Sequence, residues 1–144
     1  MGTFQKKLAD VERAWHVVDA ADAPLGRVAT RVAGLLRGKH KTYWAPHLDA
    51  GDFVVVVNAA RVKLTGRKLE QKFHRHHSGY PGGLKSTPYA EIMEHHPDLA
   101  VHWAVAGMVP KNHLGRKMLK RLRVYAGPEH RHQAQKPAAY TLEG

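Results

Sequence analysis

The sequence contains no cysteine among its 144 residues. This absence excludes disulfide bonds, thiolate zinc ligands and cysteine nucleophiles, and it fits a reducing compartment. Serine is scarce as well: Ser78 and Ser86 are the only two, and no GxSxG motif surrounds either of them. The sequence therefore offers no recognisable serine or cysteine nucleophile.

Long hydrophobic runs are also missing. The strongest, Phe53 to Val57, is far shorter than the roughly 20 apolar residues that a membrane-spanning helix needs. The opening residues lack the apolar stretch of a secretory signal peptide. Lys6 stands where an N-myristoylation motif requires Ser or Thr. We therefore expect a soluble, intracellular protein.

Acidic residues are few, with 12 Asp and Glu against 23 Lys and Arg, for a formal net charge of +11. Residues 1–60 hold eight basic and six acidic side chains, whereas residues 61–144 hold fifteen and six. A surplus of this size requires either a polyanionic partner or a reason to tolerate self-repulsion, and nucleic acid is the commonest such partner, with an anionic membrane second. Hydrophobic residues make up 43%, which is enough for a folded core.

The hydrophobic pattern of the first half predicts a strand, a helix and a second strand. Residues 15–20 (WHVVDA) are typical of a buried strand, and Asp22 with Pro24 opens a helix that Gly38 ends. The continuous valines of residues 53–59 (FVVVVNA) are typical of a parallel strand that is covered on both faces. A strand, a helix and a second strand form a right-handed crossover, so we expect an α/β domain.

Shorter elements are predicted in the second half. Two strands are expected at Val62–Thr65 and Lys72–Ser78, the latter followed by the turn-rich GYPGG of residues 79–83. Residues 87–88 (Thr-Pro) are expected as the N-cap and first turn of a helix through His96.

Two further helices and a short strand complete the prediction. One helix restarts at Pro97 and runs to about Met108, with apolar positions one turn apart at Leu99, Trp103 and Ala106. Asn112 caps the next helix, whose apolar face consists of Leu114, Met118, Leu119 and Leu122. Val124 and Tyr125 are expected as a short return strand.

The last of these helices, Asn112 to Arg123, is the first candidate for a binding surface. Its exposed face is predicted to carry only cations: Arg116, Lys117, Lys120 and Arg121. Ordinary solvated helix faces mix charge signs, so a cationic face favours contact with RNA phosphates, which gives affinity without sequence choice.

The segment KFHRHHSGYPGG, Lys72 to Gly83, is the second candidate. Lys72 and Arg75 can pair with phosphates. Four rings can stack on bases or hydrogen-bond to 2′-hydroxyls: His74, His76, His77 and Tyr80. The alternative is a surface hairpin that is merely basic, and both interpretations remain open.

Metal, nucleotide and catalytic sites lack their patterns. The twelve histidines include the clusters 74–77 and 130–132, but no HExxH occurs and no third ligand stands at a recognised spacing. The glycines of residues 34–38 fall at the C-terminal end of a helix, where the dipole repels phosphate. The carboxylate pairs Asp49/Asp52 and Glu91/Glu94 have no recognisable nucleophile and base beside them. We expect no metal, no cofactor and no catalysis.

Several long stretches resemble the thirteenth-protein family of the bacterial large ribosomal subunit. They are PLGRVAT from Pro24, LLRGKHK from Leu35, HLDAGDFVVVVNA from His47, HSGYPGGLKS from His77 and GMVPKNHLGRKMLKRLRVYAGPEH from Gly107. These blocks occur in family order and span roughly Trp15 to Gln135. Arg131 stands where the family often has Pro, and the two ends of the chain match nothing that can be placed.

The resemblance implies one three-layer α/β domain over residues 1–144, with a mostly parallel sheet flanked by helices. Residues 1–13 are then a polar lead-in and residues 127–144 an irregular tail. It further implies a structural component of the large subunit that binds its large RNA and joins early in assembly. Neighbouring large-subunit proteins are implied partners, and the chain's own messenger RNA is a candidate partner because some family members regulate theirs. No membrane, homo-oligomer or cofactor is expected, and the location is the cytoplasmic ribosome.

The RNA-contact residues come from the resemblance and from the histidine-rich segment together. They are Arg27, Arg37, Lys39, Lys41, Arg67, Lys68, Lys72, His74, Arg75, His76, His77, Ser78, Tyr80, Lys85, Lys111, Asn112, Arg116, Lys117, Lys120 and Arg121.

Two other classes of function remain open at this point. One is a small α/β enzyme or nucleotide binder whose basic patch grips an anionic substrate, which would require a pocket with convergent polar groups. The other is a chaperone or translational regulator that acts off the ribosome.

The sequence alone predicts that reversing Lys117, Lys120 and Arg121 to Glu weakens RNA binding without unfolding the protein, because all three are expected in solvent. Circular dichroism and an RNA titration check the two parts of this prediction. Unchanged affinity in a folded variant would remove this helix from the contact surface.

Overall fold

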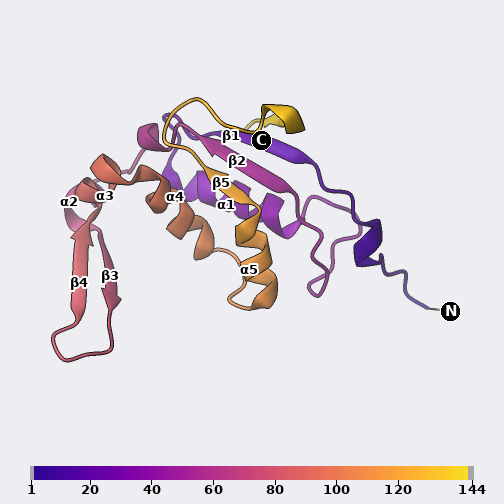
Figure 1. Ribbon diagram of the computed structural model, residues 1–144, viewed down its shortest axis with the longest axis horizontal. Coiled ribbons are helices and arrows are strands. Elements are labelled where there is room, and N and C mark those ends of the chain that lie inside the picture. Colours follow the sequence, from indigo (N-terminus) through magenta and orange to yellow (C-terminus); the bar gives the residue numbers. More distant parts are fainter. Residues whose placement is uncertain (1, 143–144) are drawn as a thin grey trace.

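A four-stranded parallel sheet lies at the centre of the protein in this computed structural model, which describes residues 2–142 (Figure 1). The strands are β1 (Trp15–Asp19), β2 (Phe53–Val57), β5 (Leu122–Val124) and β6 (Ala138–Tyr140), in the order β5-β2-β1-β6. Val54, Val55 and Val56 of β2 are completely buried, because β2 has a neighbour on each side and cover on both faces. The valine run therefore correctly predicted a central parallel strand.

Three helices pack on one face of this sheet: α1 (Leu25–Arg37), α4 (Pro97–Ala106) and α5 (His113–Lys120) (Figure 1). Val28 and Val32 of α1 meet Val54 in a continuous apolar core. Among the described residues, no helix has both the length and the apolar character needed to cross a bilayer. The α/β domain with a parallel sheet flanked by helices is confirmed.

The C-terminal segment lies over the opposite face of the sheet. Trp15 and Phe53 share this face because they are register partners on the neighbouring strands β1 and β2, and their rings stack with centroids 4.4 Å apart. The His132 ring lies 5.1 Å from Trp15, and its Nε2 is 2.9 Å from the Tyr125 hydroxyl oxygen. A single 3₁₀ turn, η3 (Gln133–Gln135), follows before the chain enters β6.

Capping signals set two helix ends as predicted. Gly38 ends α1 in the left-handed conformation, at φ 79°, and its N–H donates to the carbonyls of Gly34 and Leu35. Asn112 caps α5, since its side-chain oxygen accepts from the Gly115 N–H at 3.0 Å.

A two-stranded antiparallel hairpin projects away from the body (Figure 1). Its strands are β3 (Phe73–His77) and β4 (Leu84–Pro88), and the short helices α2 (Lys68–Gln71) and α3 (Tyr89–His95) flank its base. The strand expected over Lys72–Ser78 is therefore confirmed, whereas the pattern did not predict β4.

Three predictions of local structure were wrong. The segment Val62–Thr65 forms no strand: it follows the 3₁₀ turn η2 (Ala59–Arg61) and makes one isolated bridge, between Pro24 and Lys63. Pro88, not Thr87, is the N-cap of α3, and no side chain caps that helix. Helix α4 ends at Ala106 and buries Pro97, Ala100, Val101 and Val105, so the apolar face expected around Leu99 is not the packed one.

Both ends of the chain carry more structure than expected. The lead-in contains a 3₁₀ turn, η1 (Leu8–Asp10), and the tail contributes β6, which pairs with β1 in parallel. The return strand begins at Leu122, two residues before the predicted one.

The connection from α1 to β2 predicts a strong effect of one methyl group at Gly51. A Cβ at this position would lie 1.6 Å from the Leu36 carbonyl oxygen, so backbone has to move. We expect Gly51→Ala to lower the free energy of unfolding by at least about 1–3 kcal/mol, measured by urea titration.

Gly26→Ala is the matched control, because a Cβ there meets nothing within 4 Å and the residue lies inside α1. It should raise stability by about 0.5–1 kcal/mol. Equal stability of the two alanine variants would contradict the close approach of Gly51 to α1.

Candidate nucleic-acid interface

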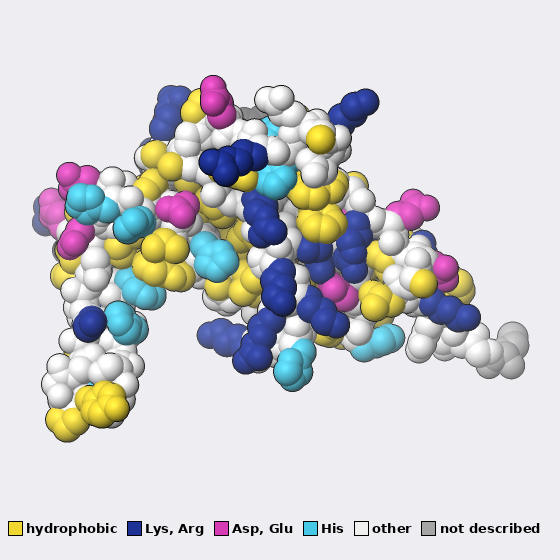
Figure 2. Space-filling view, in the orientation of Figure 1, with side chains coloured by type: hydrophobic (Ala, Val, Ile, Leu, Met, Phe, Trp, Pro, Cys, Tyr) yellow, Lys and Arg dark blue, Asp and Glu magenta, His cyan; other side chains and the backbone are white. Residues whose placement is uncertain are grey.

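One group of outward-facing cations lies on and beside α5. We call Lys111, Arg116, Lys117, Lys120 and Arg123 the α5 surface; all five are exposed. Lys and Arg side chains gather in a band over β5 and α5 (Figure 2). Within residues 2–142, none of the five takes part in an ion pair. Their charge is therefore not neutralised within the protein.

The hairpin carries a second group. Arg75, His76, His77 and Lys85 are exposed, and Tyr80 at the tip is 76% exposed. Hydrogen bonds within the turn stabilise its shape. His77 Nδ1 accepts from the Gly79 N–H at 2.9 Å, and the Ser78 N–H donates to the Gly83 carbonyl. Tyr80 is thus an aromatic ring held in solvent on an ordered turn, which suits stacking on a base.

Two smaller groups complete the predicted set. At the end of α1, Arg37 and Lys39 lie over the Trp44 ring, 5.9 and 5.8 Å from its centroid. Beside α2, Arg67, Lys68 and Lys72 are exposed. Arg27 is exposed on α1, Asn112 is exposed although its side chain caps α5, and His74 is half-buried at the base of the hairpin.

Arg121 is not on the exposed surface, and the expectation that it lies in solvent was wrong. The residue is 6% exposed, and its guanidinium makes a bidentate pair with Asp49 at 2.7 and 2.8 Å. Its Nη2 also donates to the Leu36 carbonyl at 3.0 Å. Arg121 follows the last residue of α5, where the chain turns toward the sheet, so its side chain enters the interior. The triple reversal therefore cannot separate RNA contact from unfolding, because Arg121→Glu would face Asp49.

Lys41 also directs its charge inward. Its ammonium lies 2.7 Å from Asp52 Oδ1, and its side chain is only 12% exposed. Asp52 neutralises this cation, so Lys41 contributes less to a phosphate surface than its neighbour Lys39.

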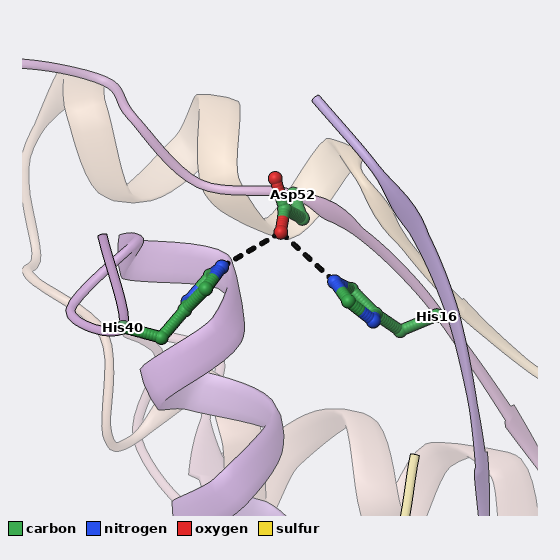
Figure 3. Close-up of side chains that lie close together, drawn as sticks. All are labelled: His16, His40 and Asp52. Atoms are coloured by element: carbon green, nitrogen blue, oxygen red, sulfur yellow. Dashed lines mark hydrogen bonds and ion pairs between the residues drawn. The ribbon is translucent and has the colours of Figure 1, made fainter. Parts of the chain in front are cut away.

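Asp52 is the hub of this interior cluster. It is 1% exposed and accepts from Lys41, from the Ala14 N–H and from the rings of His16 and His40 (Figure 3). Burial by itself raises the pKa of Asp52. The hydrogen bonds from Lys41, His16 and Ala14, with the Lys41 charge, outweigh it and hold that pKa below its usual value.

Three of these side chains have the spacing of a metal site. One ligand atom from each of His16, His40 and Asp52 lies within 4.8 Å of the others. However, a carboxylate can only accept, so each imidazole carries its proton on the Nε2 that would have to bind a cation. The Lys41 ammonium beside Asp52 repels a further positive charge. The chemistry of the cluster fits hydrogen bonding better than metal binding.

Sequence reasoning missed one structural residue and one functional candidate. Arg13 donates to the Asp49 carbonyl at 2.9 Å and so stabilises the fold, although the lead-in around it carries no motif. Lys63 is exposed and lines a cavity beside α4. In the sequence, the only signal for Lys63 was the alternation of apolar Val62 with charged Lys63.

Comparisons with known proteins agree over nearly the whole chain. A family model described as "Ribosomal protein L13" matches residues 13–131. A Thermobifida fusca (strain YX) protein named large ribosomal subunit protein uL13 is 63% identical over 142 residues, covering 99% of this chain and 95% of its own. Proteins of the same name are 58% identical in Beutenbergia cavernae, over 99% of this chain and 97% of its own, and 54% identical in Syntrophomonas wolfei, over the full length of both.

The lowered pKa of Asp52 predicts an acid-dependent stability. A depressed carboxyl pKa stabilises the fold above the unfolded value of about 3.9, and this contribution is lost as pH falls through the folded value. At pH 5, the free energy of unfolding should be about 2 kcal/mol higher for wild type than for Asp52→Asn. The difference should shrink as the pH falls below the unfolded value of about 3.9.

Thermal and urea unfolding across this pH range measure the difference. The exposed Glu91→Gln variant is the control and should follow wild type throughout. A gap between wild type and Asp52→Asn that stays constant down to pH 2 would show that the carboxylate is not stabilised by its partners.

Proposed function

The chain belongs to the ribosomal protein L13 family, and from this premise we propose that it binds large-subunit ribosomal RNA and supports subunit assembly. As a member, it is a structural protein of the large ribosomal subunit and not an enzyme, and its place is the cytoplasmic ribosome. Ribosomal RNA and neighbouring ribosomal proteins are its implied partners.

The α5 surface is the observation that carries this proposal. Its five cations are exposed and take part in no ion pair within residues 2–142, and Lys and Arg side chains form a band on this side of the molecule (Figure 2). Phosphates that meet such a surface displace condensed counterions, and the released ions supply most of the free energy of binding. An enzyme's anionic substrate would instead require convergent polar groups in an enclosed site.

Rigid placement of the cations supports a role in holding RNA geometry. The Asn112 cap fixes the start of α5, and Arg121 fixes its end through Asp49. Lys117 and Lys120 lie between these two anchors, one turn apart. They therefore present charge at a fixed separation, which allows phosphates to be positioned as well as attracted.

The hairpin projects away from the body (Figure 1). Arg75 and Lys85 provide charge along it, and Tyr80 provides a stacking ring at its end. We infer that the hairpin reaches RNA segments that the α5 surface does not contact.

Reversal of Lys117 and Lys120 to Glu should weaken binding to a large-subunit RNA fragment by roughly tenfold or more. The slope of log affinity against log salt should fall by about 2, one for each lost phosphate contact. A filter-binding or fluorescence titration at several salt concentrations measures both.

The control is Lys7→Glu with Lys136→Glu, which changes the net charge equally at two exposed positions outside the predicted contacts. Circular dichroism should be unchanged in both double variants. Equal weakening by the two pairs would mean that net charge alone, and not the α5 surface, determines RNA affinity.

Sedimentation of the tagged chain from cell lysate tests the ribosomal assignment directly. Migration with the large subunit after a moderate-salt wash is the expected result. A slowly sedimenting free protein in ribosome-rich lysate would favour a role off the ribosome.

A further inference from the structure

A cavity of about 680 Å³ opens between the base of the hairpin, helix α4 and the start of α1. This volume falls within the ~300–1,000 Å³ that small-molecule sites span. It lies beside the α5 surface, since Lys111 belongs to both. The expected RNA contacts Lys68, Lys72 and His74 also line it.

The interior of the cavity is aromatic. The rings of His74 and Trp103 stack in parallel, with centroids 3.6 Å apart and planes within 4°. Tyr89 lies beneath Lys72, whose ammonium is 4.7 Å from the ring centroid. Burial raises the pKa of Tyr89, so its phenol stays neutral. The Trp103 face thus already accepts a flat heteroaromatic ring in the geometry that base stacking uses.

The rim of the cavity is cationic. Lys63, Lys68, Lys72 and Lys111 line it and are exposed. Among residues 2–142, no ion pair involves any of the four. No acidic side chain of the described part of the chain lines the cavity. Anions are therefore attracted to its mouth while its interior favours an aromatic ring.

We propose that this lysine-rimmed cavity holds one unstacked nucleotide of single-stranded RNA. The base lies against the His74–Trp103 pair, and the phosphates on either side of it pair with the rim lysines. The assignment rests on the proposed RNA binding and adds to it a site that distinguishes unpaired from base-paired RNA.

A base-paired duplex does not satisfy this site. In an A-form helix the bases are stacked on each other and the major groove is too narrow for side chains to enter, whereas loops and bulges can splay a base out. Stacking of a base on an aromatic side chain gives ~1–3 kcal/mol and tolerates any base. The cavity should therefore select unpaired RNA without selecting its sequence.

Photocrosslinking locates the base. Full-length protein is irradiated with a single-stranded ten-nucleotide RNA that carries 5-iodouridine, and the adducts are mapped by mass spectrometry. Adducts on Trp103, His74 or Tyr89 are expected. Adducts confined to Tyr80 or to the α5 surface would overturn the assignment.

Affinity measurements test the same proposal independently. Wild type should bind the single strand at least about fivefold more tightly than a blunt duplex of equal charge. Trp103→Leu should bring the ratio of single-strand to duplex affinity to about one, because the stacking ring is lost. Lys68→Gln with Lys72→Gln should reduce the ratio. Lys117→Gln with Lys120→Gln removes the same charge outside the cavity, and it should weaken both RNAs while leaving the ratio unchanged.

The outcomes separate the two levels of the proposal. Equal binding of both RNAs by wild type would overturn the cavity site and leave RNA binding intact, whereas no binding of either would overturn both. Uridine monophosphate that competes at the concentration of the oligonucleotide would assign the cavity to a free nucleotide and overturn its assignment to RNA. If Trp103→Leu fails to fold, the crosslinked residue and the lysine variants still decide the question.

Discussion

Asp49 and Asp52 lie buried in the loop that leads into β2, and each bonds to residues from other elements of the chain. Asp49 pairs with Arg121 at the end of α5 and with Arg13 before β1. Asp52 holds Lys41 after α1 and the Ala14 N–H before β1. A chain with a net charge of +11 repels itself. These two carboxylates tie three of its cationic segments together at one end of the sheet, and the remaining structure depends on that closure.

This arrangement divides the cations into two populations. Those that meet a buried carboxylate stabilise the fold, because removing one partner would leave a charge without compensation in the interior. Others, such as the five of the α5 surface, are exposed and take part in no ion pair within residues 2–142, and they give the protein its polyanion surface. Lys39 and Lys41 belong to different populations although only one residue separates them, since Lys41 reaches Asp52 and Lys39 lies over Trp44. Residue type alone therefore does not define a binding site in a basic protein.

The same distinction explains what the sequence could predict. Signals that act over a few residues were reliable: the valine run of β2, the left-handed Gly38 and the Asn112 cap each depend on local geometry. Arg121 was misplaced because its partner is 72 residues away, and no local pattern encodes it. Strands β4 and β6 were missed because β4 is mostly polar and β6 has three residues. Large side chains suggested the wrong face of α4, where the small Ala100 permits the close packing instead.

Charge and stacking have different physical consequences for RNA binding. The lysines of α5 supply salt-dependent affinity that any strand can satisfy. Aromatic rings add a contribution that salt screens less and that only an unpaired base can use. Two such rings stand at opposite ends of the hairpin, Tyr80 at its tip and Trp103 at its base, where the His74 stack joins β3 to α4. RNA that engages both ends would fix the direction of the hairpin relative to the body. The projecting strands would then orient RNA as well as attract it, which is what a structural role in a particle requires.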